Sequence, residues 1–254
     1  RVLREAFASR GLAAYLVGGA VRDGLLDKET GDIDVSVQGK TSEVGPELAA
    51  LVDGRFIVLD AGRDLSRIVT RGEGAGRVID LSPLKGGIEQ DLGRRDFTLD
   101  AMAVPLNEPE SPEQEPRLAD PWGGFRDLRE GVVRAVTPSV FADDAARLLR
   151  GPRLAAQLGF RLEAETARSI GANAHLISNV APERVRDEVL KILSYPRARD
   201  SLLELDRLGL LCLVLPVLAG TKDVVQPKEH QWDVFRHSVE TVGQVERIAT
   251  DNRP

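Results

Sequence analysis

The chain has 254 residues, 42% of them hydrophobic and 29% charged, which is enough to bury a sizeable core in more than one structural unit. Its single cysteine, Cys212, excludes an internal disulfide and a cysteine-rich zinc site. The net charge of −6 excludes a protein that binds polyanions over its whole surface. The longest apolar run, residues 208–220, is too short to span a bilayer, so we expect a cytoplasmic protein with no membrane association.

Short β-like runs alternate with helical segments in the N-terminal part of the chain. The runs with the residue types and alternation typical of strands are 14–17, 32–37, 55–59, 67–70 and 77–81. From residue 143 onward the apolar positions follow a helical period almost without a break. The sequence therefore predicts an α+β protein, with a mixed-sheet head domain over residues 1–140 followed by an all-α part.

A glycine pair follows the first of these runs. Val17 is expected to end a strand, Gly18 and Gly19 to form a turn without Cβ atoms, and Ala20 to begin a helix. Free N–H groups at such a turn can receive phosphate oxygens, and Arg22 would add a fixed positive charge against a triphosphate. Taken alone, a glycine pair is more often a simple turn.

Two carboxylates lie on the next predicted strand. Asp32 and Asp34 are two residues apart, and the strand period of two sends both side chains to one face of the sheet. A divalent cation would neutralise their repulsion, and hard oxygen ligands suit Mg²⁺. The alternative for an isolated Asp-x-Asp pair is a solvent-facing strand edge.

The glycine turn, helix and Asp-x-Asp pair together resemble the nucleotidyltransferase superfamily. The longer segment Gly-Gly-Ala-Val-Arg-Asp-Gly-Leu-Leu, residues 18–26, resembles the class II CCA-adding enzymes and bacterial poly(A) polymerases. The resemblance extends to about residue 215. It implies a nucleotidyltransferase-type head in which two Mg²⁺ ions at Asp32 and Asp34 catalyse phosphoryl transfer from CTP and ATP to a tRNA 3′ end. Asp80, on a neighbouring predicted strand, is the candidate for a third catalytic carboxylate.

A second motif, Arg-Arg-Asp-Phe-Thr-Leu-Asp-Ala at residues 94–101, looks like the family's Arg-Arg-Asp-Phe-Thr-x-Asn-Ala. The resemblance implies that Arg95 and Asp96 contact the ribose and phosphates of the bound nucleotide. On composition alone, a surface cluster of ion pairs is the alternative. Asp100 stands where the family has asparagine, which puts any sugar contact of that asparagine in doubt.

A third motif begins the predicted helical part. Asp144 and Arg147 match the family's Glu/Asp-Asp-x-x-Arg pattern and are predicted neighbours on one helix face. The resemblance implies that Arg147 donates to the acceptor edge of cytosine or adenine while Asp144 accepts from the exocyclic amino group, which excludes uracil. A capped helix start with a local ion pair is the alternative.

The helical part is divided further. Residues 141–215 are predicted to be a neck and body that bind RNA and the nucleobase, and basic residues outnumber acidic ones from 147 to 199. Arg150 and Arg153 continue the basic face of the third motif toward phosphates. Pro152 is expected to kink this helix. Residues 216–254 are expected to begin a truncated C-terminal helical region that resembles HD-type domains.

The sequence leaves the added nucleotides open. Full CCA addition, CC-only or A-only addition and poly(A) synthesis all fit the motifs. The connector of residues 82–90 is short, whereas the resemblance implies a flexible segment here in enzymes that complete CCA. A small-molecule nucleotidyltransferase and a non-catalytic RNA-binding module are more distant alternatives. The sequence does not indicate an oligomeric state.

Overall fold

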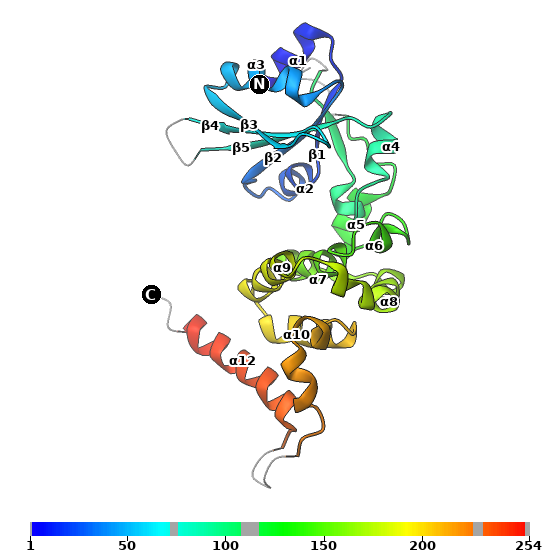
Figure 1. Cartoon of the computed structure of the whole chain (residues 1–254), viewed down its shortest axis with the longest axis vertical. Coiled ribbons are helices and arrows are strands. Elements are labelled where there is room, and N and C mark those ends of the chain that lie inside the picture. Colours follow the sequence, from blue (N-terminus) through cyan, green and yellow to red (C-terminus); the bar gives the residue numbers. More distant parts are fainter. Residues whose placement is uncertain (1, 72–75, 108–116, 226–230, 252–254) are drawn as a thin grey trace. The chain divides into compact units, whose positions relative to one another are not determined.

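The computed structural model of the chain describes residues 2–71, 76–107, 117–225 and 231–251 (Figure 1). The chain divides into two compact units, Arg1–Leu128 and Arg129–Pro254. The first unit ends before the boundary at residue 140 that the sequence predicted. Within the described ranges, no helix combines the length and the apolar character needed to cross a membrane.

A six-stranded mixed sheet forms the first unit, which we call the head unit. Its strands are β1 (Ala14–Val17), β2 (Asp32–Val37), β3 (Gly54–Asp60), β4 (Leu65–Thr70), β5 (Val78–Pro83) and β6 (Ala103–Pro105). Their order is β3-β4-β5-β2-β1-β6, with β2 and β5 parallel and the other neighbours antiparallel. The five predicted strands are confirmed, and β6 is an additional strand that the pattern did not indicate.

Helices cover the two faces of this sheet differently. Helices α1 (Val2–Arg10) and α3 (Thr41–Leu51) lie on one face, and the short helix α2 (Gly19–Leu25) lies on the other (Figure 1). The side chains of β2 explain which face α1 and α3 cover, because Val35 and Val37 are fully buried in a core with residues of these two helices. The intervening polar residues of β2 therefore face the α2 side.

The second motif includes a short 3-10 helix, η1 (Thr98–Asp100), which packs against helix α5 (Gly124–Glu130). The Asp120 carboxylate accepts the N–H groups of Gly124 and Phe125 at 2.6 and 3.0 Å and so caps α5. A Cβ at Gly124 would lie 2.1 Å from the Thr98 carbonyl oxygen, so only glycine permits this close packing. The Thr98 hydroxyl also donates to Asp127 of α5 at 2.8 Å, so α5 and η1 are held together.

The second unit is helical, as predicted, apart from one short parallel ladder. Its helices are α6 (Val140–Asp143), α7 (Arg147–Leu158), α8 (Ala164–Asn173), η2 (Ala174–Asn179), α9 (Pro182–Ser194), α10 (Ala198–Arg207), α11 (Leu211–Val214), η3 (Pro216–Thr221) and α12 (Val234–Asp251). The ladder joins β7 (Val132–Val133) and β8 (Arg161–Leu162). Helix α7 continues through Pro152, which is buried.

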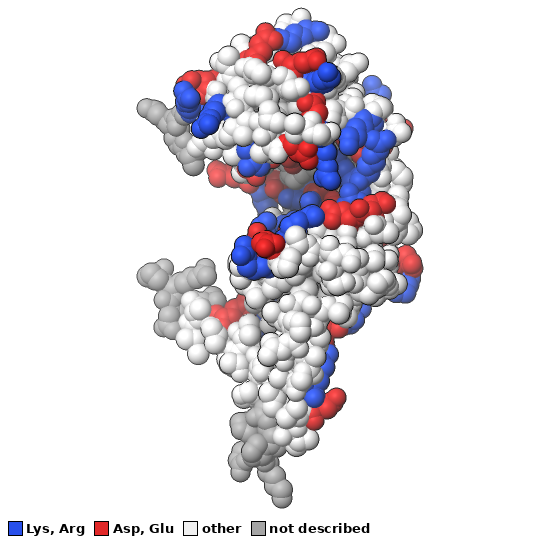
Figure 2. All heavy atoms as spheres, in the orientation of Figure 1, with Lys and Arg blue, Asp and Glu red and all other residues white. Residues whose placement is uncertain are grey.

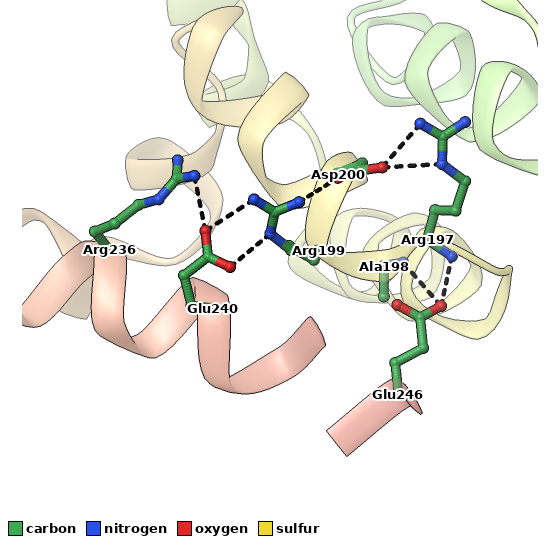
Figure 3. Close-up of polar contacts among 7 residues, drawn as sticks. All are labelled: Arg197, Ala198, Arg199, Asp200, Arg236, Glu240 and Glu246. Atoms are coloured by element: carbon green, nitrogen blue, oxygen red, sulfur yellow. Dashed lines mark hydrogen bonds and ion pairs between the residues drawn. The ribbon is translucent and has the colours of Figure 1, made fainter. Parts of the chain in front are cut away.

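Charged contacts hold α12 against α10 (Figure 3). Glu240 accepts from Nε and Nη2 of Arg199 at 2.8 and 2.9 Å and pairs with Arg236 at 2.7 Å. The hydrogen bonds from Arg199 are the largest cause that lowers the pKa of Glu240. Further along α12, Glu246 accepts the backbone N–H of Arg197. Helix α12 is therefore attached to α10 and its N-terminal end by carboxylate contacts.

Candidate functional site

A row of facing residues crosses the centre of the head sheet. Asp34 on β2 lies opposite Asp80 on β5, and Asp80 lies opposite Arg67 on β4. On the other side, Asp34 lies opposite Val17, the last residue before the glycine turn. Residues that face each other in a ladder project to the same side of the sheet. Asp80 is therefore beside Asp34, on the α2 face, where the sequence predicted a third carboxylate.

Asp34 lies in a negatively charged environment. It is half-buried, whereas Asp32 is exposed. Burial is the main cause that raises the pKa of Asp34 above its ordinary value of 3.8. Asp80, Asp100 and Asp32 raise this pKa further, and only Arg95 among the main contributors lowers it. The site thus carries more negative charge than its own cations balance, which suits an added divalent cation.

Asp80 is held by an arginine that the sequence analysis missed. Arg67 donates from Nε and Nη2 to the two carboxylate oxygens of Asp80 at 2.7 and 2.8 Å. The alternation of β4 could have revealed this residue, because Arg67 shares the face of the site. Across the described ranges, no group of three or more histidine, cysteine, aspartate or glutamate side chains is arranged to hold a metal ion. Asp32 and Asp34 would therefore leave most positions on a bound Mg²⁺ to phosphates and water.

The glycine turn borders the same carboxylates. Gly18 has φ 69° and ψ −142°, a backbone region that is essentially restricted to glycine. A Cβ built there would lie 3.0 Å from both Arg95 Nη1 and Asp34 Oδ2. The missing side chain therefore lets a guanidinium and a carboxylate approach the turn. Gly19 begins α2, which starts one residue before the predicted Ala20.

Arg22 is inside the head unit. Its residue exposure is 5%, and its guanidinium donates to Asp23 at 2.8 Å and to Asp100 at 2.6 Å. The sequence predicted a charge directed at a triphosphate. In the structure the described contacts of this side chain are carboxylates of the protein itself.

Arg95 and Asp96 lie at the start of the second motif. Arg95 Nη1 donates to the carbonyl oxygen of Asp100 at 3.4 Å, and Nη2 lies 3.7 Å from Asp91. The Nε–H of Arg95 is buried without a hydrogen-bond partner among the described residues. Asp96 is buried, and its carboxylate accepts the N–H of Phe97 at 3.0 Å.

The third motif differs from its prediction. Asp144 lies in an extended conformation between α6 and α7, so it does not share a helix face with Arg147, and that expectation is wrong. Its carboxylate accepts the N–H of Ala146 at 3.0 Å and pairs with Arg184 of α9 at 3.1 Å. Although burial raises the pKa of Asp144, Ala146, Arg184 and Arg147 together hold it below 3.8. This short-range bond to the backbone competes with the regular helical pattern at Asp144.

The basic residues of α7 have different surroundings. Arg147 donates to the carbonyl oxygen of Val140 at 3.2 Å. Arg153 is tied to Glu188 of α9 at 2.7 Å, and Arg150 is half-buried. Figure 2 shows acidic and basic side chains close together on the face drawn. The predicted basic face of α7 is therefore partly used in holding α7 to α9.

A mixed sheet with a glycine turn, an Asp-x-Asp strand and an adjacent carboxylate defines a nucleotidyltransferase-type head. Residues 14–134 match the family described as the poly A polymerase head domain. Residues 159–221 match the family described as the probable RNA and SrmB-binding site of polymerase A. The chain therefore belongs to the family of poly(A) polymerases and class II tRNA nucleotidyltransferases.

Individual relatives support this assignment. The chain is 40% identical over 200 residues to a CC-adding tRNA nucleotidyltransferase of Geobacter sulfurreducens, a match that covers 78% of this chain and 44% of that protein. It is 38% identical over 237 residues to an A-adding tRNA nucleotidyltransferase of Deinococcus radiodurans, covering 91% and 52%. The Thermotoga maritima CCA-adding enzyme complexed with tRNA has a similar structure, with a TM-score of 0.80, 28% identity and coverage of 99% and 57%. The chain spans about half the length of these relatives.

Proposed function

We propose that this chain carries the catalytic part of a tRNA nucleotidyltransferase, which adds nucleotides from CTP and ATP to the 3′ end of tRNA and releases pyrophosphate. The observation that carries the proposal is the convergence of Asp34 and Arg95 on the Gly18 turn. Phosphoryl transfer requires a carboxylate to bind a metal ion, a guanidinium to bind phosphate, and a backbone without a side chain that phosphate can approach.

Asp32 and Asp34 would hold Mg²⁺, and the surplus negative charge around Asp34 supports this fit. Bound Mg²⁺ would supply activation of the attacking 3′ hydroxyl and charge neutralisation of the triphosphate. Arg95 would direct its terminal nitrogens, of which Nη1 lies next to Gly18, at the triphosphate, and Asp96 would accept from the ribose hydroxyls. Asp80 would complete the acidic face beside Asp34, with its carboxylate oriented by Arg67.

Selection of the base is assigned to the second unit. Asp144 and Arg147 would read the Watson–Crick edge of the incoming nucleotide, and the depressed pKa of Asp144 keeps it ionised as an acceptor for an amino group. Arg150 and Arg153 would extend the basic surface toward RNA phosphates. Since tRNA is the proposed partner, we assign the enzyme to the cytoplasm.

Replacing Asp144 by alanine is expected to relax discrimination against UTP more than it weakens triphosphate binding. A lost base-edge contact is worth about 1–3 kcal/mol of discrimination. Incorporation from CTP and from UTP into tRNA would be compared by kcat/KM. The neighbouring Asp143→Ala provides a matched control, because Asp143 is exposed at the end of α6. If Asp144→Ala excludes UTP as well as the parent and the Asp143 variant do, the protein does not read the base through Asp144.

A CC-adding enzyme is a second candidate, favoured by the connector before the second motif. Strand β5 ends at Pro83 and the next helix is α4 (Ile88–Leu92), which leaves four residues between them. The N–H of Leu84 donates to the Val37 carbonyl oxygen at 2.8 Å, and that of Lys85 to the Asp91 carboxylate at 3.4 Å. Because the segment is short and hydrogen-bonded at Leu84 and Lys85, it has little freedom to move the base-reading residues from cytosine to adenine specificity. The similarity to a CC-adding relative supports the same choice.

The added nucleotides are identified with three tRNA substrates that lack CCA, CA or only the terminal A. The complete protein is given CTP and ATP separately with Mg²⁺, and the 3′ ends are sequenced. One adenosine added to a tRNA that ends in CC indicates a CCA-completing or A-adding enzyme, whereas CTP incorporation without this step indicates a CC-adding enzyme. A long adenosine tail would indicate poly(A) synthesis, and no addition to any substrate would contradict the proposal.

A further inference from the structure

Two arginines lie on the α2 face of the head sheet, beyond the carboxylates of the candidate site. The strand ladders form two neighbouring rows across this face. One row runs through Asp34, Asp80, Arg67 and Ile57, and the next runs through Asp32, Val78, Val69 and Arg55. Residues that face each other in a ladder, and those two positions further along a strand, project to one side of the sheet. Arg67 and Arg55 therefore share a face with both proposed metal ligands.

In the described part of the head unit, the helices pack against other surfaces. Helix α2 packs on β1, β2 and η1, and α3 packs on the opposite face of β3, β4 and β5 (Figure 1). Arg55 is exposed, and its guanidinium has no partner among the described residues. The side chain of Arg67 is 36% exposed, and its Nη1 makes no bond with any residue that the structure describes. Both guanidinium groups are thus accessible cations.

Asp80 fixes the direction of Arg67. The two bonds from Nε and Nη2, at 2.7 and 2.8 Å, hold the guanidinium in one plane with the carboxylate. These bonds are the largest cause that raises the pKa of Arg67, and Asp32 and Asp34 raise it further. Arg67 is therefore an oriented cation close to the proposed metal ligands.

The direction of phosphoryl transfer relates this face to the RNA. The attacking and leaving oxygens lie roughly in line, on opposite sides of the transferring phosphorus. In the proposed site the triphosphate lies at the Gly18 turn and Arg95, on the β1 side of Asp34. The attacking 3′ hydroxyl then approaches from the other side, where β5 and β4 carry Asp80 and Arg67. The phosphates that precede this hydroxyl need cations on the same side.

We infer that Arg67 and Arg55 bind the last two internucleotide phosphates of the RNA 3′ end, on the side of Asp34 opposite the triphosphate. This inference rests on the proposed nucleotide addition. Neighbouring strands are about 4.8 Å apart, so the backbones of Arg67 and Arg55 lie about 10 and 14 Å from that of β2. A chain of two nucleotides can span this distance.

The test is binding of a tRNA that lacks its 3′ CCA to the complete protein, without nucleotide, in Arg55→Gln, Arg67→Gln and Arg67→Lys. Each glutamine variant should bind about tenfold more weakly, because one charged hydrogen bond is lost. Each should also reduce the slope of log affinity against log salt by about 0.7, the value for one phosphate of a single strand. Arg67→Lys keeps a cation and should bind within about threefold of the parent. The KM for CTP should stay within about threefold in Arg55→Gln.

Arg10→Gln is the control, because Arg10 of α1 pairs with Glu47 on the opposite face of the sheet, and it should bind tRNA like the parent. A second tRNA, whose last two internucleotide phosphates are neutral methylphosphonates, shows where the arginines act. The parent should bind this tRNA about tenfold or more weakly than the unmodified one. Arg55→Gln should lose clearly less, because one of the contacts is already absent.

The inference fails if both glutamine variants bind tRNA as tightly as Arg10→Gln. It also fails if the losses from Arg55→Gln and from the methylphosphonates add in full, because the arginine then acts elsewhere on the RNA. A raised KM for CTP at unchanged tRNA affinity would place the triphosphate on this side instead, and a parent that does not bind tRNA would contradict the inference as well. A parent that binds tRNA but adds no nucleotide contradicts the proposed function, and the binding results still decide what the arginines contact.

Discussion

Replacing Asp34 by alanine is expected to lower the rate of nucleotide addition by about a thousandfold or more, and Asp32→Ala is expected to do the same. Each change removes a proposed Mg²⁺ ligand, and with it the charge that stabilises the transferring phosphoryl group. Incorporation of CTP into tRNA under saturating Mg²⁺ measures the effect. Robust incorporation by either variant would contradict a metal site on this strand.

Stability separates loss of a ligand from loss of folding. Because the pKa of Asp34 is raised mainly by burial, its charged form opposes folding, and Asp34→Asn should make the metal-free protein at least as stable as the parent at neutral pH. The folded parent takes up a proton before the unfolded chain does. Its stability relative to the variant should therefore increase as the pH falls through the raised pKa toward 3.8. A variant that is less stable at neutral pH would show that Asp34 is a structural residue.

Gly18→Ala is expected to lower kcat/KM about a hundredfold, the scale of a catalytic group displaced by about 1 Å. The new methyl group would lie 3.0 Å from Arg95 Nη1 and from Asp34 Oδ2, and both side chains would have to move. The backbone at φ 69° and ψ −142° would also be strained by any side chain. Steady-state kinetics with CTP and tRNA measures the loss.

Gly11→Ala is the matched control for backbone strain. Gly11 also has a positive φ, of 60°, but a Cβ there would meet nothing within 4 Å. Both variants should lose some stability, whereas only the Gly18 variant should lose most of its activity. Equal kinetic losses in the two variants would show that strain, rather than crowding of Arg95 and Asp34, determines the result.

Local patterns were sufficient to predict much of the head unit. Strands β1 and β2 begin and end at the predicted residues, and apolar and polar residue types alternate along β2. The family resemblance suggested a third carboxylate on a neighbouring strand, and Asp80 of β5 does lie opposite Asp34 in the ladder. Strand β6 was missed, because three residues are too few to show a period.

The pairings of charged side chains were not predictable from spacing. Arg22 pairs with Asp100 and Asp144 with Arg184, and in both cases the partner comes from a distant part of the sequence. The helical period around Asp144 also hid a break, because the side chain binds the backbone N–H of Ala146 and ends the regular pattern. Such contacts depend on how the elements pack, which a single sequence does not specify.

The most direct test of the account is Mg²⁺-dependent extension of a tRNA that lacks its 3′ CCA by the complete protein with CTP. The account predicts that cytidine is added, that pyrophosphate is released in equal amount, and that Asp34→Asn abolishes both while the protein stays folded. Extension that persists in Asp34→Asn would contradict the account. A parent protein that adds no cytidine to tRNA would contradict it as well.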